Sequence, residues 1–141
     1  MPRNSHEFIT EYLPNATMET AHHILIYGCE YPGYMERDTP RAVWDCGEMA
    51  RNRDDEPLFP RGPVCRGARQ IVYSWAMDAP SLKLPSGVGF KVGRGTDIRY
   101  LVLQVHYAKV DRFINGDFDH SGITLKMLPQ NNHEYANLNL I

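Results

Sequence analysis

The amino-acid sequence predicts an all-β protein, folded as an antiparallel, jelly-roll-like β-sandwich with one long disulfide-stapled loop. Three observations lead to this prediction. Apolar and polar residues alternate with a period of two in several short stretches, as in half-buried strands. Glycine and proline turns separate these stretches, and no segment has the apolar period of an amphipathic helix. A length of 141 residues fits one domain with a sizeable core.

The first two strands are expected at residues 7–13 and 20–29. The turn between them contains Asn15, which begins an Asn-Ala-Thr glycosylation acceptor that matters only in a secreted protein. The second strand opens with two histidines, His22 and His23. Neighbouring strand residues point to opposite faces, so both rings reach one ion only if the strand begins after His22 or a bulge re-aims one ring.

A long turn-rich segment follows from Glu30 to Arg69, with a charged run at 51–56 that we expect to be solvated. A structureless loop of this length is unusual in a compact domain. Three cysteines, at positions 29, 46 and 65, bracket it and predict a loop stapled in an oxidising compartment. Because three is an odd number, at least one thiol has no partner within the chain.

The second half of the chain predicts strands at 70–77, 88–92, 98–107 and 123–128, with a hairpin-type connection at 93–97. Alternation in the strand 98–107 places Gln104 and His106 side by side on its more polar face. The domain therefore spans residues 7–129. Residues 130–141 are expected to form a flexible polar tail.

Charge and composition exclude several functions. A net charge of −2 gives no basis for binding nucleic acid or an anionic membrane surface. No apolar run approaches the roughly 20 residues that cross a bilayer. The start has no signal-peptide pattern, which taken literally leaves the chain in the cytosol, whereas the cysteines favour secretion. A fragment of a longer secreted protein would explain both observations.

Three histidines on two predicted strands, His22, His23 and His106, form a candidate metal site. Three imidazoles without a neighbouring carboxylate or thiolate suit copper, zinc or another late divalent ion. Such a site keeps coordination positions open, as redox or hydrolytic chemistry requires. The alternative is that each histidine is simply hydrogen-bonded within the sandwich.

The run from His22 to Cys29 resembles the first signature of the copper type II, ascorbate-dependent monooxygenases, which reads His-His-Met, two variable residues, Phe, one variable residue, Cys. Ile24 and Tyr27 depart conservatively from that signature. Later segments are similar, in order, to further parts of the family's N-terminal copper domain, and the similarity runs from about Phe8 to Leu128. These segments are 71–76, 84–93 and 100–107.

The resemblance implies that His22, His23 and His106 hold an electron-donating copper reduced by ascorbate. Gln104, one pleat from His106, is expected to contact and tune this site. Cys29 and Cys65 look equivalent to one family disulfide. Cys46 has lost its family partner, and His120 stands where the family usually has cysteine.

Within the family, the segments at 84–90 and 103–107 look closer to the branch that hydroxylates the Cα of a peptide's C-terminal glycine with O2. The resemblance implies an enzyme of the secretory pathway or extracellular space. In that family a second copper and the peptide-binding residues lie in a following domain. We therefore expect this chain alone to bind one copper, with no catalytic residue of its own and no peptide turnover.

Two other functions remain open. The first is a non-catalytic β-sandwich that keeps the scaffold for partner binding. The second is a member of the family's dopamine-hydroxylating branch.

Overall fold

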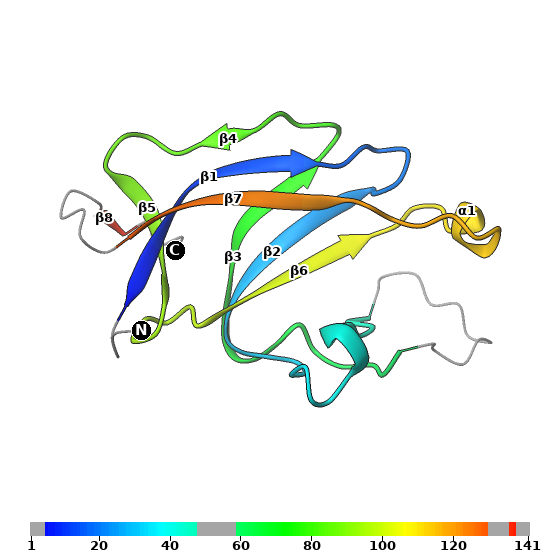
Figure 1. The fold of residues 1–141 in the computed structure, drawn as a ribbon, viewed down its shortest axis with the longest axis horizontal. Coiled ribbons are helices and arrows are strands. Elements are labelled where there is room, and N and C mark those ends of the chain that lie inside the picture. Colours follow the sequence, from blue (N-terminus) through cyan, green and yellow to red (C-terminus); the bar gives the residue numbers. More distant parts are fainter. Residues whose placement is uncertain (1–4, 48–58, 130–135, 138–141) are drawn as a thin grey trace.

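The computed structural model describes residues 5–47, 59–129 and 136–137. Two sheets face each other, and their named strands pair antiparallel with one exception, the parallel pair β5–β8 (Figure 1). The predicted all-β sandwich is thus confirmed. The charged run at 51–56 and the tail, apart from Ala136 and Asn137, lie outside the described residues.

The first sheet is built around strand β1 (His6–Asn15). Strand β7 (Gly122–Pro129) pairs with most of the length of β1. Strands β4 (Leu82–Lys83) and β5 (Val88–Gly93) each pair with a shorter part of β1. The short strand β8 (Ala136–Asn137) adds to β5. This sheet carries none of the candidate metal ligands and forms the opposite wall of the core.

The second sheet has the order β3–β2–β6. Its central strand β2 (His23–Pro32) pairs with β3 (Cys65–Ala76) on one side and with β6 (Tyr100–His106) on the other. All three candidate ligands lie on or directly beside this sheet, so its register determines how the histidines meet.

The core between the sheets follows the period-two pattern of β2. Ile24 and Ile26 are buried, and from the other sheet Ile9 and Tyr12 are fully buried against them. The Tyr12 ring stacks on Tyr73 with ring centroids 4.4 Å apart. Burial of each such large side chain contributes about 1.5–3 kcal/mol. The outer face of β2 is thereby left for the histidines and the long loop.

Strand β2 begins at His23 and not at residue 20 as predicted. The backbone N–H groups of Thr20 and Ala21 both donate to the carbonyl of Thr17, closing a turn that delays the strand. Strand β3 begins at Cys65, five residues earlier than predicted, because β2 continues to Pro32 and offers it a partner.

The connection at 93–97 was predicted as a hairpin, and this prediction is wrong. The turn itself forms, since Gly93 N–H donates to Ile98 O at 2.8 Å. The strands on either side nevertheless belong to different sheets, β5 to the first and β6 to the second. Ile98 is buried and turns the chain across the core. Turn chemistry alone therefore does not show that the flanking strands pair.

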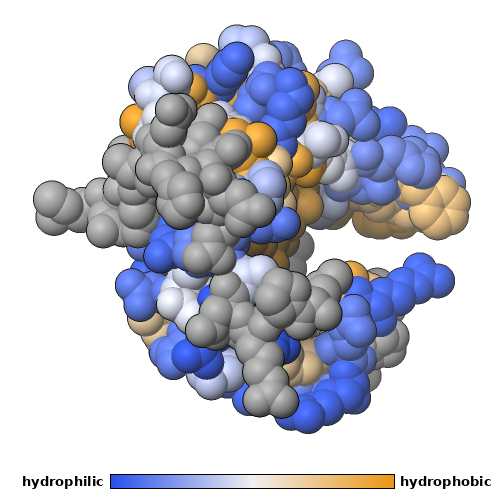
Figure 2. All heavy atoms as spheres, turned by 60° about the vertical axis from the view of Figure 1, so that its left-hand side comes forward, coloured by the Kyte–Doolittle hydropathy of each residue, from blue (hydrophilic) through white to orange (hydrophobic). Residues whose placement is uncertain are grey.

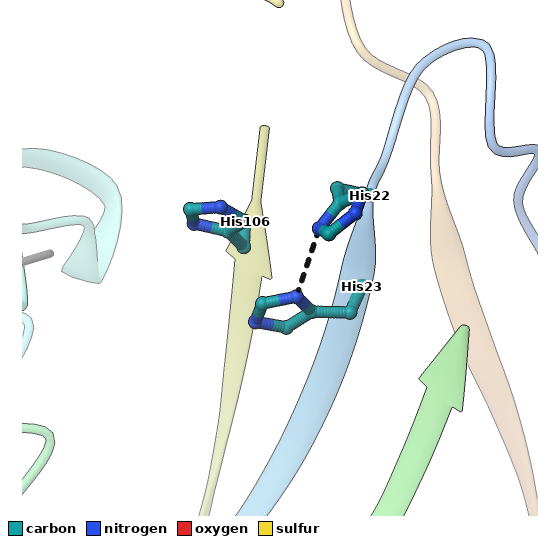
Figure 3. A group of neighbouring side chains, drawn as sticks. All are labelled: His22, His23 and His106. Atoms are coloured by element: carbon teal, nitrogen blue, oxygen red, sulfur yellow. Dashed lines mark hydrogen bonds between the residues drawn. The ribbon is translucent and has the colours of Figure 1, made fainter. Parts of the chain in front are cut away.

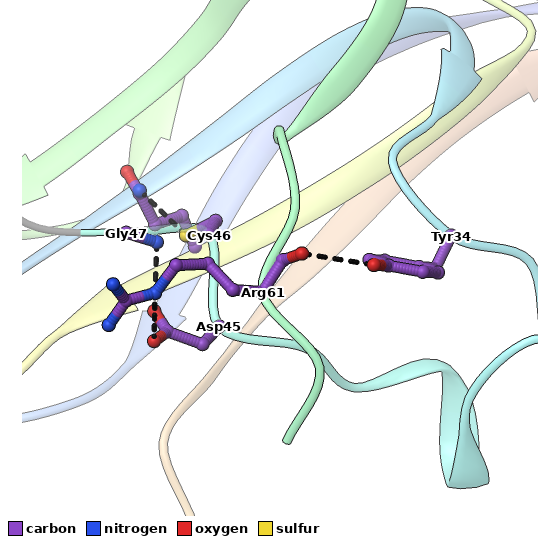
Figure 4. A network of polar contacts seen from close by, with 6 residues as sticks. Tyr34, Asp45, Cys46, Gly47 and Arg61 are labelled. Atoms are coloured by element: carbon purple, nitrogen blue, oxygen red, sulfur yellow. Dashed lines mark hydrogen bonds and ion pairs between the residues drawn. The ribbon is translucent and has the colours of Figure 1, made fainter. Parts of the chain in front are cut away.

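The long loop between β2 and β3 is closed by a disulfide between Cys29 and Cys65, as expected from the resemblance. Polar contacts organise its described part: Arg61 pairs with Asp45 through its side chain and accepts a hydrogen bond from the Tyr34 hydroxyl at its carbonyl (Figure 4). A 3-10 turn (Pro40–Ala42, η1) lies within this loop.

The only α-helix among the described residues is α1 (Asp111–Ile114), a single turn that follows β6. It is too short to show an apolar period, which is why the sequence gives no sign of it. Within the residues that the structure describes, no helix is long and apolar enough to cross a membrane.

Candidate metal site

His23 and His106 are directly opposite each other in the antiparallel pairing of β2 with β6. Their rings stack, with centroids 4.5 Å apart and planes 18° from parallel. Cross-strand neighbours on one face lie close enough for side chains to interact. One register position therefore brings together two imidazoles that are 83 residues apart in the sequence.

His22 reaches the same place from outside the strand. Because β2 begins at His23, His22 is not bound by the alternation of strand faces. Its backbone N–H donates to His106 O at 2.8 Å, and its ring lies 5.4 Å from the His23 ring and 5.6 Å from the His106 ring, between centroids. The Nδ1 atoms of His22 and His23 are 3.3 Å apart (Figure 3).

The spacing of these rings fits a shared ion. One nitrogen from each of the three histidines lies within 4.8 Å of the other two. Two imidazole nitrogens bound tetrahedrally at about 2.0–2.1 Å would be about 3.3 Å apart. Rotation about χ2, which is a soft torsion in histidine, can supply the remaining approach of the most distant nitrogen. His22 is exposed, so the solvent side of the trio is open.

Gln104 lies one pleat from His106 on the same face, opposite Leu25. Its amide donates to the Cys46 sulfur at 3.0 Å and accepts from the Tyr27 hydroxyl at 3.5 Å. The side chain is thus tied to the loop, and its proposed influence on the metal site stays a prediction.

A groove of about 810 Å³ continues from this face, between the loop at 32–46 and residues 100–104 of β6. Its lining includes Trp44, Cys46 and Gln104. Figure 2 shows the surface hollowed on one side, with hydrophilic side chains along the lower rim and hydrophobic ones on the underside of the upper rim. Gln104 is common to this groove and to the face that carries His106, whereas none of the three histidines lines the groove.

The segment after β6 is braced beside the histidines. The Tyr107 hydroxyl donates to the Asp119 carboxylate, which also accepts from Ser121 N–H at 2.8 Å. Burial and this hydrogen bond raise the pKa of Tyr107. Burial alone would raise the pKa of Asp119, but the hydrogen bonds from Ser121 and Tyr107 outweigh it and lower that pKa.

Sequence reasoning missed Tyr107 and Asp119 as neighbours of the site. The Asp-x-Ser spacing at 119–121 signals a side-chain-capped turn, and this could have drawn attention to it. Their approach to each other depends on how the chain bends after β6, which has no sequence pattern.

The other residues singled out from the sequence do not join the three histidines of the candidate site. Asn15 is exposed at the end of β1, as a glycosylation acceptor needs to be. His120 is exposed. Cys46 is a free, partly exposed thiol that packs against the buried Cys29–Cys65 cluster.

Comparison with known proteins shows the family to which the chain belongs. Residues 1–113 match the family model of the copper type II ascorbate-dependent monooxygenase, N-terminal domain. The chain is 34% identical over 140 residues to peptidyl-glycine alpha-amidating monooxygenase A of Xenopus laevis, covering 99% of this chain and 13% of that protein. It is 34% identical over 127 residues to peptidyl-glycine alpha-amidating monooxygenase of Mus musculus, covering 90% of this chain and 11% of the relative.

The chain thus spans only 11–13% of the length of these relatives. The family match nevertheless extends over most of its 141 residues and includes all three histidines of the candidate site. The chain belongs to the copper type II ascorbate-dependent monooxygenases and represents their N-terminal domain.

Proposed function

We propose that this domain binds one copper ion through His22, His23 and His106 and serves as the electron-donating half of a peptidylglycine monooxygenase. The observation that supports this most directly is the approach of the three imidazoles to within 4.8 Å in a chain of a copper-dependent family. Neutral nitrogen donors suit copper in both of its common oxidation states.

Bound copper would supply a one-electron couple that ascorbate can reduce. The chain's own contribution is to hold the donors. The β2–β6 pairing fixes His23 against His106, and the exposed side of His22 leaves the site open to a small reductant. The sheet restricts rearrangement of His23 and His106 between oxidation states, which favours rapid electron transfer.

The proposed substrate is a peptide ending in glycine, hydroxylated at its Cα with O2. This rests on the relatives, which are named as peptidyl-glycine alpha-amidating monooxygenases. The peptide and the second copper would bind in a following domain, so the domain alone is proposed to bind copper without turnover. The Cys29–Cys65 disulfide supports a place in the secretory pathway or outside the cell.

The copper proposal is tested by metal stoichiometry. The oxidised domain, loaded with Cu(II) and freed of excess ion, should carry about one copper per chain, and ascorbate should abolish its Cu(II) EPR signal. The triple variant His22→Ala, His23→Ala, His106→Ala should lose this copper. His120→Ala, which removes an exposed histidine outside the trio, is the matched control. Unchanged stoichiometry in the triple variant would defeat the proposal.

The proposed place in a peptide-hydroxylating enzyme needs a second experiment. The domain is joined to the remaining length of the Xenopus relative in place of that protein's own segment. Because the peptide-binding residues of the hybrid come from the relative, the experiment asks whether this domain can serve as the electron-donating half. The hybrid should hydroxylate glycine-extended peptides and lose that activity when His22, His23 and His106 are replaced by alanine. A folded, copper-loaded hybrid without turnover would contradict the proposal.

A further inference from the structure

The three histidines are not held equally. His23 and His106 lie in paired strands, so the sheet fixes their positions. His22 precedes the strand, is exposed, and follows the turn at residues 17–21. Its backbone N–H donates to His106 O at 2.8 Å, and the turn on its other side is the second determinant of where its ring lies relative to the stacked pair.

One side chain from the segment after β6 contacts this turn. Arg112 lies in α1, six residues after His106, and its Nη1 donates to Thr20 Oγ1 at 3.0 Å. Its Nε pairs with Asp117 at 3.3 Å, which orients the guanidinium. The two chain segments that deliver His22 and His106 are thus joined by a contact between residues 92 positions apart.

Both partners of this contact are themselves supported. The segment that carries Arg112 is braced by the hydrogen bond from Tyr107 to Asp119, and the Phe113 ring packs edge-on against Tyr107 with centroids 5.0 Å apart. On the other side, Met18 N–H donates to the Asp78 carboxylate at 2.8 Å. The turn before His22 is therefore held by two hydrogen bonds, one to Asp78 just after β3 and one to Arg112 in the segment after β6.

We infer that Arg112 and Thr20 form a clasp that positions His22 for metal binding. This inference rests on the proposed copper function. Partly exposed charged contacts contribute little to folding stability. The clasp therefore acts mainly on the third ligand, and its loss should weaken the site while leaving the sandwich folded.

The test uses two variants that break the clasp from opposite ends, Arg112→Ala and Thr20→Val. Each should weaken Cu(II) binding about tenfold, at the low end of the effect of outer partners on metal affinity. Each should also change the Cu(II) hyperfine splitting in EPR, because the third imidazole is displaced. Thr20→Ser keeps the hydroxyl and should restore wild-type affinity and spectrum. Arg94→Ala, at an exposed arginine in the 93–97 turn, is the control.

A second set of variants, made in the His22→Ala protein, separates an effect on the position of His22 from a general loss of stability. In His22→Ala protein, Arg112→Ala should cause no further loss of copper affinity, since the residue it positions is gone. Thermal unfolding of the metal-free variants checks that they remain folded, and Thr20→Val remains informative where Arg112→Ala does not fold.

The outcomes separate the two proposals. If the wild-type domain binds no copper, the proposed function fails and the clasp fails with it. If the wild-type domain binds copper and both clasp variants match it in affinity and spectrum, the clasp alone is overturned. An equal loss in the presence and absence of His22 would also overturn it.

Discussion

At the scale of single residues, a buried polar atom without a hydrogen-bond partner is as informative as the contacts between the histidines. Tyr12 is fully buried, and among the described residues its hydroxyl has no hydrogen-bond partner. A buried hydroxyl of this kind costs free energy that a purely apolar ring does not. Its ring stacks on Tyr73 and supports the wall opposite the histidine sheet.

Tyr12→Phe should therefore raise the free energy of unfolding by about 1 kcal/mol at neutral pH. Urea unfolding measures it. Tyr31→Phe, at an exposed tyrosine, is the control and should show no such gain. A loss of stability in Tyr12→Phe would mean that the hydroxyl has a partner.

The same residue predicts a pH dependence. Burial, and secondarily the nearby Tyr73, raise the pKa of Tyr12 above the usual tyrosine value. At pH values below the usual tyrosine pKa, the Tyr12 phenol is neutral in both the folded and the unfolded protein, so its ionisation takes nothing from the free energy of unfolding. Above that pKa the unfolded chain ionises first, so stability falls as pH rises toward the folded pKa. Unfolding free energies between pH 9 and pH 11 should decline less steeply in Tyr12→Phe than in the wild type.

Glycine in β2 shows how closely the two halves of the core approach. A Cβ at Gly28 would lie 2.8 Å from the Ile98 side chain, whereas a Cβ at Gly122 would meet nothing within 4 Å. Gly28→Ala should destabilise the domain by about 1–3 kcal/mol through overpacking. Gly122→Ala is the matched control and should be near neutral. Denaturant unfolding of both variants decides whether the β2–Ile98 contact is as tight as described.

At the scale of elements, the disulfide and the strand ends define what the sheet can present. The Cys29–Cys65 bridge joins the ends of β2 and β3 that lie away from the histidines, and it is buried with Val64. Its two cysteines are 36 residues apart, so the bridge mainly restricts the unfolded chain.

Cys65→Ser should lower the free energy of unfolding by about 3–4 kcal/mol in the chain-entropy model. Cys46→Ser, which changes a thiol outside the bridge, should cost much less. Thermal and denaturant unfolding compare the two. Equal effects would indicate that Cys46 contributes to the bridge in solution.

Sequence pattern predicted the strands well and their partners poorly. Alternation identified the faces of β2 and β6 and thereby placed Gln104 and His106 together. It could not reveal that the turn after β5 crosses to the other sheet, because the turn residues satisfy the same hydrogen bonds in either case. The start of β2 after His22 was one of two open routes, and the Thr17 turn decided between them.

At the scale of the whole molecule, one sheet forms the scaffold and the other presents the site. The three histidines were chosen from sequence by their place in apolar strands and by the family signature. The approach of His23 to His106 needed only the β2–β6 register. The braces around them, Arg112 with Thr20 and Tyr107 with Asp119, come from irregular segments and were not predictable from periodicity. The site is thus partly determined by regular structure and partly by loops.

The most direct test of the account is X-ray absorption spectroscopy of the copper-loaded domain. A site formed by His22, His23 and His106 predicts an inner shell with three imidazoles at about 2 Å and no sulfur. The control is Cys46→Ser, which should leave that spectrum unchanged. An inner shell with one imidazole, or with sulfur that disappears in Cys46→Ser, would contradict the three-histidine site.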